Sequence, residues 1–366
     1  MVTDRTDQPE LVPEHRYLLS VAELNLGREW LVGRVRLHPK GTTRALIAEQ
    51  RQAAGQGGPD WYLKYLDERV EHFDEFTVAE VSCSDAREAY GHVADALAVV
   101  RLLQHMRAPM VDTDEQTFGL PGETSQWRME YIDLLAGPAG GWFSGGVFPG
   151  WEFTDTDYEA FQNDPGLQFL SVALAKDSRS RLEQRAVLGV RLLSTSTLQD
   201  DPDLKLLAAV MALEVLIGDD REVPKKFRLA RRHAFLACSV PQKSMCGRDR
   251  PSCPYIALDP DNKTDGNTLK ALRTRAAAGE TRVLCSEYLH MIALYDARNA
   301  AVHDGSVGAD LKAVRNALYR FYRWLVPQVY AWYADHPSDD DLGQLDEEIV
   351  RVTRLNPPPP LPSPGS

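Results

Sequence analysis

The segment 204–217 constrains the fold more than any other part of this 366-residue chain. Apolar residues cover nearly the whole circumference of the helix that it would form, and such a helix is stable only when it is buried on all sides. Its longest apolar run is far too short to span a bilayer, so other helices of the protein must surround it. From about residue 157 onward, apolar residues recur at helical spacing. We therefore predict a helical bundle with residues 204–217 at its centre.

The predicted helices of this bundle cover residues 158–176, 179–193, 204–218, 224–238, 281–303 and 311–334. Pro327 removes one backbone donor from the last of them and should kink or tilt it. Glu214 lies in the central helix, where a buried carboxylate is costly unless a partner satisfies it. A structural ion pair or cap near the helix end and a role in a functional site are both open for this residue.

The first part of the chain has a different pattern. A mixed α/β domain is predicted from a helix at 86–106, a glycine-rich turn at 137–141 and several strand-like runs. The strand-like runs are 17–19, 30–37, 77–81, 127–135 and 142–153. The predicted fold class is α+β. The expected divisions are an α/β accessory domain at 1–154, the bundle at 155–336, and an acidic, then Pro-rich, disordered tail at 337–366.

The net charge of −12 argues against a protein that coats nucleic acid non-specifically, because such binding comes from neutralised phosphates. One basic cluster stands out within eight positions: Lys225, Lys226, Arg228, Arg231 and Arg232. A basic cleft for a nucleic acid and an ordinary solvated helix face are both open for it. The charged first ten residues and the odd number of cysteines, five, predict a cytoplasmic protein without membrane contact.

An arginine and a histidine near the end of the chain point to chemistry. The guanidinium of Arg298 can hold a phosphate by two charge-assisted hydrogen bonds, and the imidazole of His303 titrates near neutrality. Together they suit cleavage of RNA by its own 2′-hydroxyl without a metal, which would leave a 2′,3′-cyclic phosphate. The alternative is a helix end with a cationic side chain near its dipole and Gly305 as the cap.

Helix geometry bears on this pair. Five residues along an unbroken helix turn through about 140°, so Arg298 and His303 would not face one phosphate unless the helix ends there or a second subunit completes the site. Asn299 lies four residues before His303 on the same face and could orient the imidazole. The spacing therefore favours a shared site in a dimer.

The order of these segments resembles that of HEPN domains. The quoted features are the apolar helix ending in Ala-Leu-Glu at 212–214, the basic helix at 225–232, and Arg-Asn-x-x-x-His at 298–303 before a long last helix. The chain is most similar to the Apea-like branch of prokaryotic defence and toxin systems, over roughly residues 155–335. The resemblance implies a helical bundle that dimerises and brings two Arg-x4-His motifs into one cleft for metal-independent RNA cleavage.

In this resemblance Arg298 and His303 match the catalytic pair, Asn299 matches the polar residue beside the arginine, and Glu214 matches an acidic residue on an earlier helix. The segment 238–268, rich in Cys and Pro, is an insertion that departs from the family pattern. The expected protein is a homodimeric endoribonuclease, a toxin or anti-phage effector, with RNA as substrate and an antitoxin or sensor as a candidate partner.

Two other functions are compatible with the same residues. In the first, the bundle is a non-catalytic module that binds RNA, a nucleotide or a protein. In the second, the N-terminal domain carries the function and the bundle only dimerises. Separately, Cys238, Cys246 and Cys253, with Cys285 or His233 as a fourth ligand, could hold a structural zinc ion, although their spacing is wider than that of the usual motifs. Buried thiols without a metal are the alternative.

Overall fold

The computed structural model divides the chain into two compact units, residues 1–97 with 113–158 and residues 98–112 with 159–366. The first is built on a small antiparallel sheet and the second is helical, so the α+β class is confirmed at this level. The predicted division after residue 154 lies close to the change of unit after 158. The structure describes residues 15–54, 70, 73–107, 118–120, 130–133, 137–140, 151–199, 201–218, 225–238, 253–280, 285–305, 316, 319–339 and 342–355.

The first unit contains a six-stranded sheet in which all neighbouring strands are antiparallel. In spatial order the strands are β3 Trp30–Val32, β4 Val35–His38, β5 Thr77–Cys83, β1 His15–Val21, β6 Glu130–Asp133 and β7 Gly137–Gly140. The predicted strand 30–37 is divided at Gly33, whose φ of 64° suits a tight turn. The turn predicted at 137–141 is wrong for residues 137–140, which form β7.

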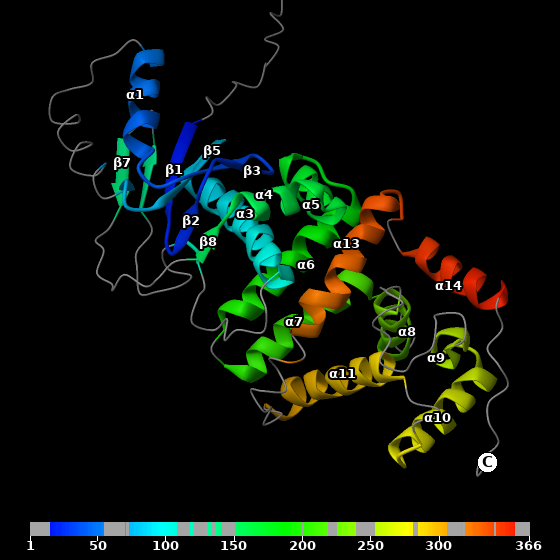
Figure 1. Ribbon diagram of the computed structural model, residues 1–366. Helices are drawn as coiled ribbons and strands as arrows, with labels where there is room; N and C mark the ends of the chain where they lie inside the picture. The colour runs from blue at the N-terminus through cyan, green and yellow to red at the C-terminus, as the bar shows by residue number, and fades with distance from the viewer. Residues whose placement is uncertain are drawn as a thin grey trace, which may run out of the picture. The chain divides into compact units, whose positions relative to one another are not determined.

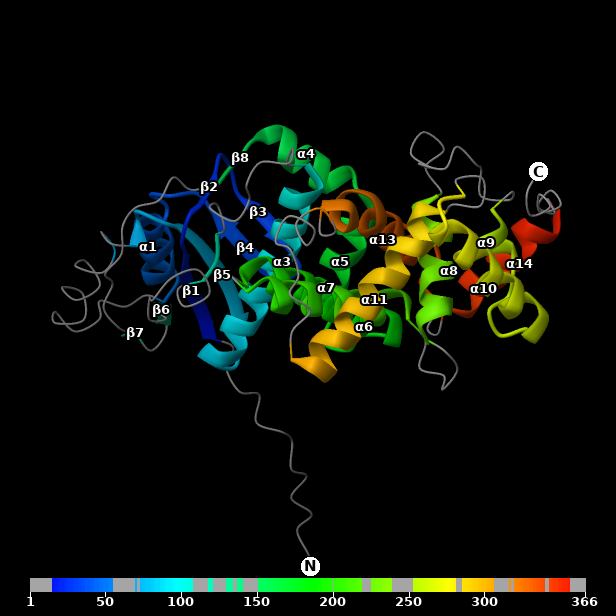
Figure 2. The ribbon, with the colours of Figure 1, turned by 90° about the horizontal axis from the view of Figure 1, so that it is seen from below.

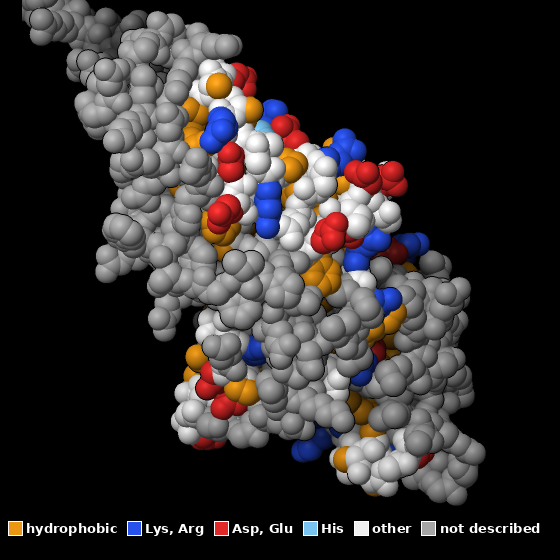
Figure 3. Space-filling view, turned by 60° about the vertical axis from the view of Figure 1, so that its left-hand side comes forward, with side chains coloured by type: hydrophobic (Ala, Val, Ile, Leu, Met, Phe, Trp, Pro, Cys, Tyr) orange, Lys and Arg blue, Asp and Glu red, His pale blue; other side chains and the backbone are white. Residues whose placement is uncertain are grey.

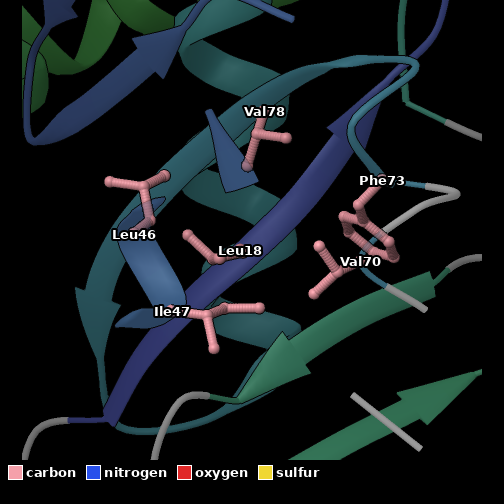
Figure 4. Close-up of a cluster of buried hydrophobic side chains, with 6 residues drawn as sticks. All are labelled: Leu18, Leu46, Ile47, Val70, Phe73 and Val78. Carbon is pink, nitrogen blue, oxygen red and sulfur yellow. The ribbon is translucent and has the colours of Figure 1, made fainter. Parts of the chain in front are cut away.

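Two shorter strands, β2 Leu24–Leu26 and β8 Trp151–Phe153, pair in parallel. Helix α1 Thr43–Ala54, which the sequence analysis did not predict, contributes Leu46 and Ile47 to a buried cluster on one face of the sheet (Figure 4). The other members of this cluster are Leu18, Val70, Phe73 and Val78. The predicted helix 86–106 is confirmed as α3 Ala86–Arg107.

The helical unit is arranged around α7 Pro202–Ile217, which packs against its neighbours α6, α8 and α11 (Figures 1 and 2). The neighbouring helices are α6 Arg181–Leu198, α8 Lys225–Ala237 and α11 Ser286–Asp304. Most apolar side chains of α7 are buried, and Leu204 and Met211 are the large ones left exposed. The predicted central position of this segment is confirmed.

Local signals explain where these helices begin. Ser180 and Glu183 form a capping box at the start of α6, and the Asp201 side chain accepts from the first turn of α7, where Pro202 needs no donor. The same Asp-Pro signal at Asp164 divides the predicted helix 158–176. The products are α4 Asp155–Asn163 and α5 Pro165–Ala175.

The disturbance predicted at Pro327 takes the form of a π-turn. Residues Phe321–Leu325 form the π-helical segment η5, in which the Val326 N–H donates to the Phe321 carbonyl. Pro327 follows at the start of α13 Val326–Asp335 and has no N–H to continue the regular pattern. A π-turn at this point accommodates the missing donor.

Three helices of the unit lie where the sequence analysis expected none. Helices α9 Pro254–Ala257 and α10 Lys263–Ala277 lie wholly or partly in the proposed insertion 238–268. Helix α14 Gly343–Leu355 lies in the tail, where Leu342, Leu345 and Ile349 are fully buried. The prediction of disorder is therefore wrong for residues 342–355. Among the described residues, no helix is both long enough and apolar enough to cross a membrane.

Candidate functional site

Helices α7 and α11 bring Glu214 and Arg298 together. The Arg298 Nη2 donates to Glu214 Oε2 over 3.4 Å, and its Nη1 donates to Asn299 Oδ1 over 3.0 Å. Both side chains of the ion pair are 24% exposed, so the pair lies at the boundary between core and solvent. The Arg298 Nε is buried and has no hydrogen-bond partner among the described residues. An incoming acceptor could therefore gain a donor that the fold leaves unused.

Arg298 and Glu214 line a cavity of about 580 Å³. Arg181 and Arg185 of α6 also line it, so its described lining residues include three arginines and one carboxylate, a balance of charge that favours an anion. Arg185 also donates to the carbonyl of Gly218 over 2.9 Å. The remaining lining residues are Gln184, Leu188, Met211, Val215, Gly218, Leu229 and Tyr295. A cavity of this volume, part cationic and part apolar, is of the size that small ligands fill.

Tyr295 adds a neutral donor to this cavity. Burial, and then the neighbouring charge of Glu214, raise the pKa of its hydroxyl above the usual value. The phenol therefore keeps its proton at neutral pH. The guanidinium carbon of Arg298 lies 5.9 Å from the centre of the Tyr295 ring, within the range of a cation–π contact.

His303 occupies a different position from Arg298. Helix α11 continues to Asp304 and ends at Gly305, which takes the left-handed conformation with φ 82°. Arg298 and His303 are thus separated by about 140° around one unbroken helix. His303 is exposed and is not among the residues that line the cavity. Within one chain the structure brings together Arg298, Asn299 and Glu214, and it leaves His303 on another face.

The cations of α8 are largely engaged within the protein. Arg232 is 1% exposed and binds both carboxylate oxygens of Asp346 as well as the carbonyls of Ile217 and Gly218. Arg231 is also buried and donates to the carbonyl of Ile256 over 2.7 Å. Arg231 and Arg232, which were predicted to contact RNA, therefore bind partners inside the fold.

The other cations of α8 lie nearer the surface. Lys226 pairs with Asp296 over 2.6 Å, and Arg228 pairs with Asp261. The side chain of Lys225 lies outside the described residues. On the face drawn in Figure 3, basic and acidic side chains of the described residues are interspersed. If α8 contacts a nucleic acid, it does so through surface residues such as Lys226, because its described cations do not form a continuous basic stripe.

Sequence reasoning missed Arg181, Arg185 and Tyr295. Arg181 and Arg185 are four residues apart and so share one face of α6, which is the signal that could have singled them out. Their proximity to Arg298 comes from tertiary packing and leaves no trace in local spacing. No protein-family model, curated protein or solved structure matches the chain.

Proposed function

We propose that the helical unit is an RNA endonuclease of the HEPN type whose active site is completed by a second copy of the chain. The observation that carries this proposal is the cavity at Arg298, whose described lining residues include three arginines and one carboxylate. Guanidiniums bind phosphate oxygens through paired, charge-assisted hydrogen bonds. His303 is exposed on another face of the same helix, where a neighbouring copy can use it.

In this mechanism the imidazole of His303 from one copy acts on a phosphate held by Arg298 of the other. The imidazole takes the proton of the 2′-hydroxyl or protonates the leaving 5′-oxygen. The 2′-oxygen forms a bond to phosphorus as the bond from phosphorus to the 5′-oxygen breaks. The products are a 2′,3′-cyclic phosphate and a 5′-hydroxyl. Arg298 stabilises the negative charge that develops on the phosphorus oxygens.

Glu214 forms an ion pair with Arg298, so a phosphate must share or displace this partner. A second hydrogen bond, from Arg298 Nη1 to Asn299 Oδ1, also holds the guanidinium in place. We assign Asn299 as a positioning residue for Arg298.

The decisive experiment mixes two inactive variants. His303→Ala should lower cleavage of a labelled RNA by roughly 10²–10⁴-fold through loss of the proton carrier. Arg298→Ala should lower it by roughly 10²–10³-fold through loss of charge stabilisation. A mixed dimer of the two variants has one site with both residues intact, so mixing should restore activity. Failure of the mixture to recover, or a monomer by light scattering, would contradict the shared site.

The nature of the reaction is tested on the same RNA. The product ends should carry 2′,3′-cyclic phosphate, and addition of EDTA during the assay should leave the rate unchanged while circular dichroism reports an intact fold. A toxin or anti-phage role predicts that expression of the wild type, but not of His303→Ala, arrests growth. An antitoxin or sensor partner would be sought in the same cells.

A second function is a non-catalytic module that binds RNA or a nucleotide. The separation of His303 from the cavity and the pairing of Arg298 with Glu214 favour it. It predicts that wild-type protein binds RNA without cutting it. It also predicts that Arg298→Ala loses binding while His303→Ala binds like the wild type.

A further inference from the structure

Three buried cysteines lie where α8, α9 and α11 meet. Cys238 directly follows α8, Cys253 precedes α9 and Cys285 precedes α11. Helix α8 packs against both of the other helices. The Sγ atoms of Cys253 and Cys285 are 3.8 Å apart, although the two residues are 32 positions apart in the chain. The fold therefore collects thiols from three separate segments.

The helix starts at Cys253 and Cys285 are unusual. An N-cap residue is commonly Ser, Thr, Asp or Asn, whose side chain accepts from the first turn of the helix. Cys253 and Cys285 occupy the N-cap positions of α9 and α11 and neither makes a side-chain cap. Their side chains are turned toward each other instead. These two N-cap positions therefore hold sulfurs that contact each other and do not cap their helices.

The distance between the two sulfurs is that of two ligands on one metal ion. Zinc binds thiolates at about 2.3 Å with tetrahedral angles, which places neighbouring sulfurs about 3.8 Å apart. The three cysteines are buried. Buried thiols can all be present as thiolates only when a cation neutralises them.

We propose that Cys238, Cys253 and Cys285 bind a structural zinc ion that joins the ends of α8, α9 and α11. Each thiol releases its proton to solvent as its sulfur bonds to the ion. The described residues hold no group of three or more His, Cys, Asp or Glu side chains already set at metal-binding spacing. Cys238 must therefore close on the pair when the ion binds.

Cys246 and His233, the other two predicted zinc ligands, are not part of the proposed site. Cys246 lies outside the described residues. The Nδ1–H of His233 donates to the carbonyl of Glu287 over 3.1 Å, and the His233 ring packs against Phe321. The proposed ligand set is limited to the cysteines, because Cys253 and Cys285 are the two residues whose sulfurs meet. The zinc ion would add to the packing of α9, a helix of only four residues whose Tyr255 and Ile256 are already fully buried.

The test is metal analysis of the full-length protein, purified without chelators from cells supplied with zinc. Wild type should contain about one zinc per chain, since a structural site holds a single ion. Cys253→Ser and Cys285→Ser should each lose most of it. Cys83→Ser is the matched control, because Cys83 is a buried thiol of the other unit and should leave the zinc content unchanged.

A second measurement covers variants that fail to fold. Wild-type protein stripped under denaturing, reducing conditions and refolded with Co²⁺ should show the intense thiolate-to-cobalt absorption of a tetrahedral sulfur site. Zinc added afterwards should abolish that absorption. Wild type that contains no zinc and gives no such absorption would overturn the proposal. A disulfide between Cys253 and Cys285, found by counting thiols in the denatured protein, would overturn it as well.

Discussion

Replacement of Arg232 tests whether this arginine stabilises the fold or contacts a nucleic acid. Its guanidinium is 1% exposed and donates to Asp346 over 2.9 and 2.6 Å and to two carbonyls, each over 3.0 Å. Arg232→Met keeps much of the aliphatic volume and removes all four bonds. Breaking a buried ion pair costs about 3–5 kcal/mol. Asp346 is 29% exposed and can turn to water, so we expect the lower end, about 3 kcal/mol.

The assay is urea unfolding followed by the helical circular dichroism signal. Lys226→Met is the matched control on the same helix. Its partner Asp296 is 51% exposed, so loss of that pair should cost at most about 1 kcal/mol. The double variant Arg232→Met with Asp346→Asn should be much more stable than the sum of the single effects implies, because each single change leaves a partner unsatisfied.

The same two variants address the role of α8 in binding. Lys226→Met should flatten the salt dependence of RNA binding if this helix touches the strand, because fewer counterions are released. Arg232→Met should leave that slope unchanged in protein that is still folded. A loss of stability below 1 kcal/mol for Arg232→Met, or a changed salt slope, would refute the structural role of this arginine.

Acid should weaken the helical unit from an unusually high pH, because burial lowers the pKa of His233 to about 3 and that of His290 to about 4. The histidines of the unfolded chain take up protons near pH 6.5, so their contribution to the free energy of unfolding is fully present above that pH. Below it, the free energy of unfolding falls by up to about 1.4 kcal/mol per pH unit for each histidine. Urea midpoints that stay flat from pH 7 to 5 would contradict this. Gly166→Ala should destabilise by about 1–3 kcal/mol, because the added Cβ would lie 2.6 Å from the Cβ of Tyr330. Gly91→Ala meets no atom within 4 Å and should instead stabilise by about 0.5–1 kcal/mol, so equal thermal shifts for the two variants would contradict the packing argument.

The parts of the fold that sequence predicted are those with local causes. The starts of α6 and α7 follow from Ser180 with Glu183 and from Asp201 with Pro202, all within a few residues. Helix α14 was missed because its charged residues resemble a solvated tail. The buried residues Leu342, Leu345 and Ile349 do recur at helical spacing, a local signal that the acidic composition outweighed.

The candidate site shows the same limit. Arg298 was chosen from its residue type and its neighbours in the chain. Glu214 was left between a structural and a functional role, and its partner proved to be Arg298, 84 residues away. The arginines of α6 join them through packing alone. Local sequence can indicate which residues carry chemistry, but which of them meet depends on long-range contacts that have no local signal.

The last carbonyls of α7 accept hydrogen bonds from three other helices. Tyr333 of α13 donates to Leu216, Arg232 of α8 to Ile217, and Arg185 of α6 to the following Gly218. Helix ends usually fray because these carbonyls have no partner. Fraying of α7 requires the hydrogen bonds from all three helices to break together. The amide hydrogens in this turn should therefore exchange with solvent only when the whole unit opens. Glu214 belongs to this slowly exchanging turn, so the backbone that carries its side chain should stay in place when a ligand enters the cavity.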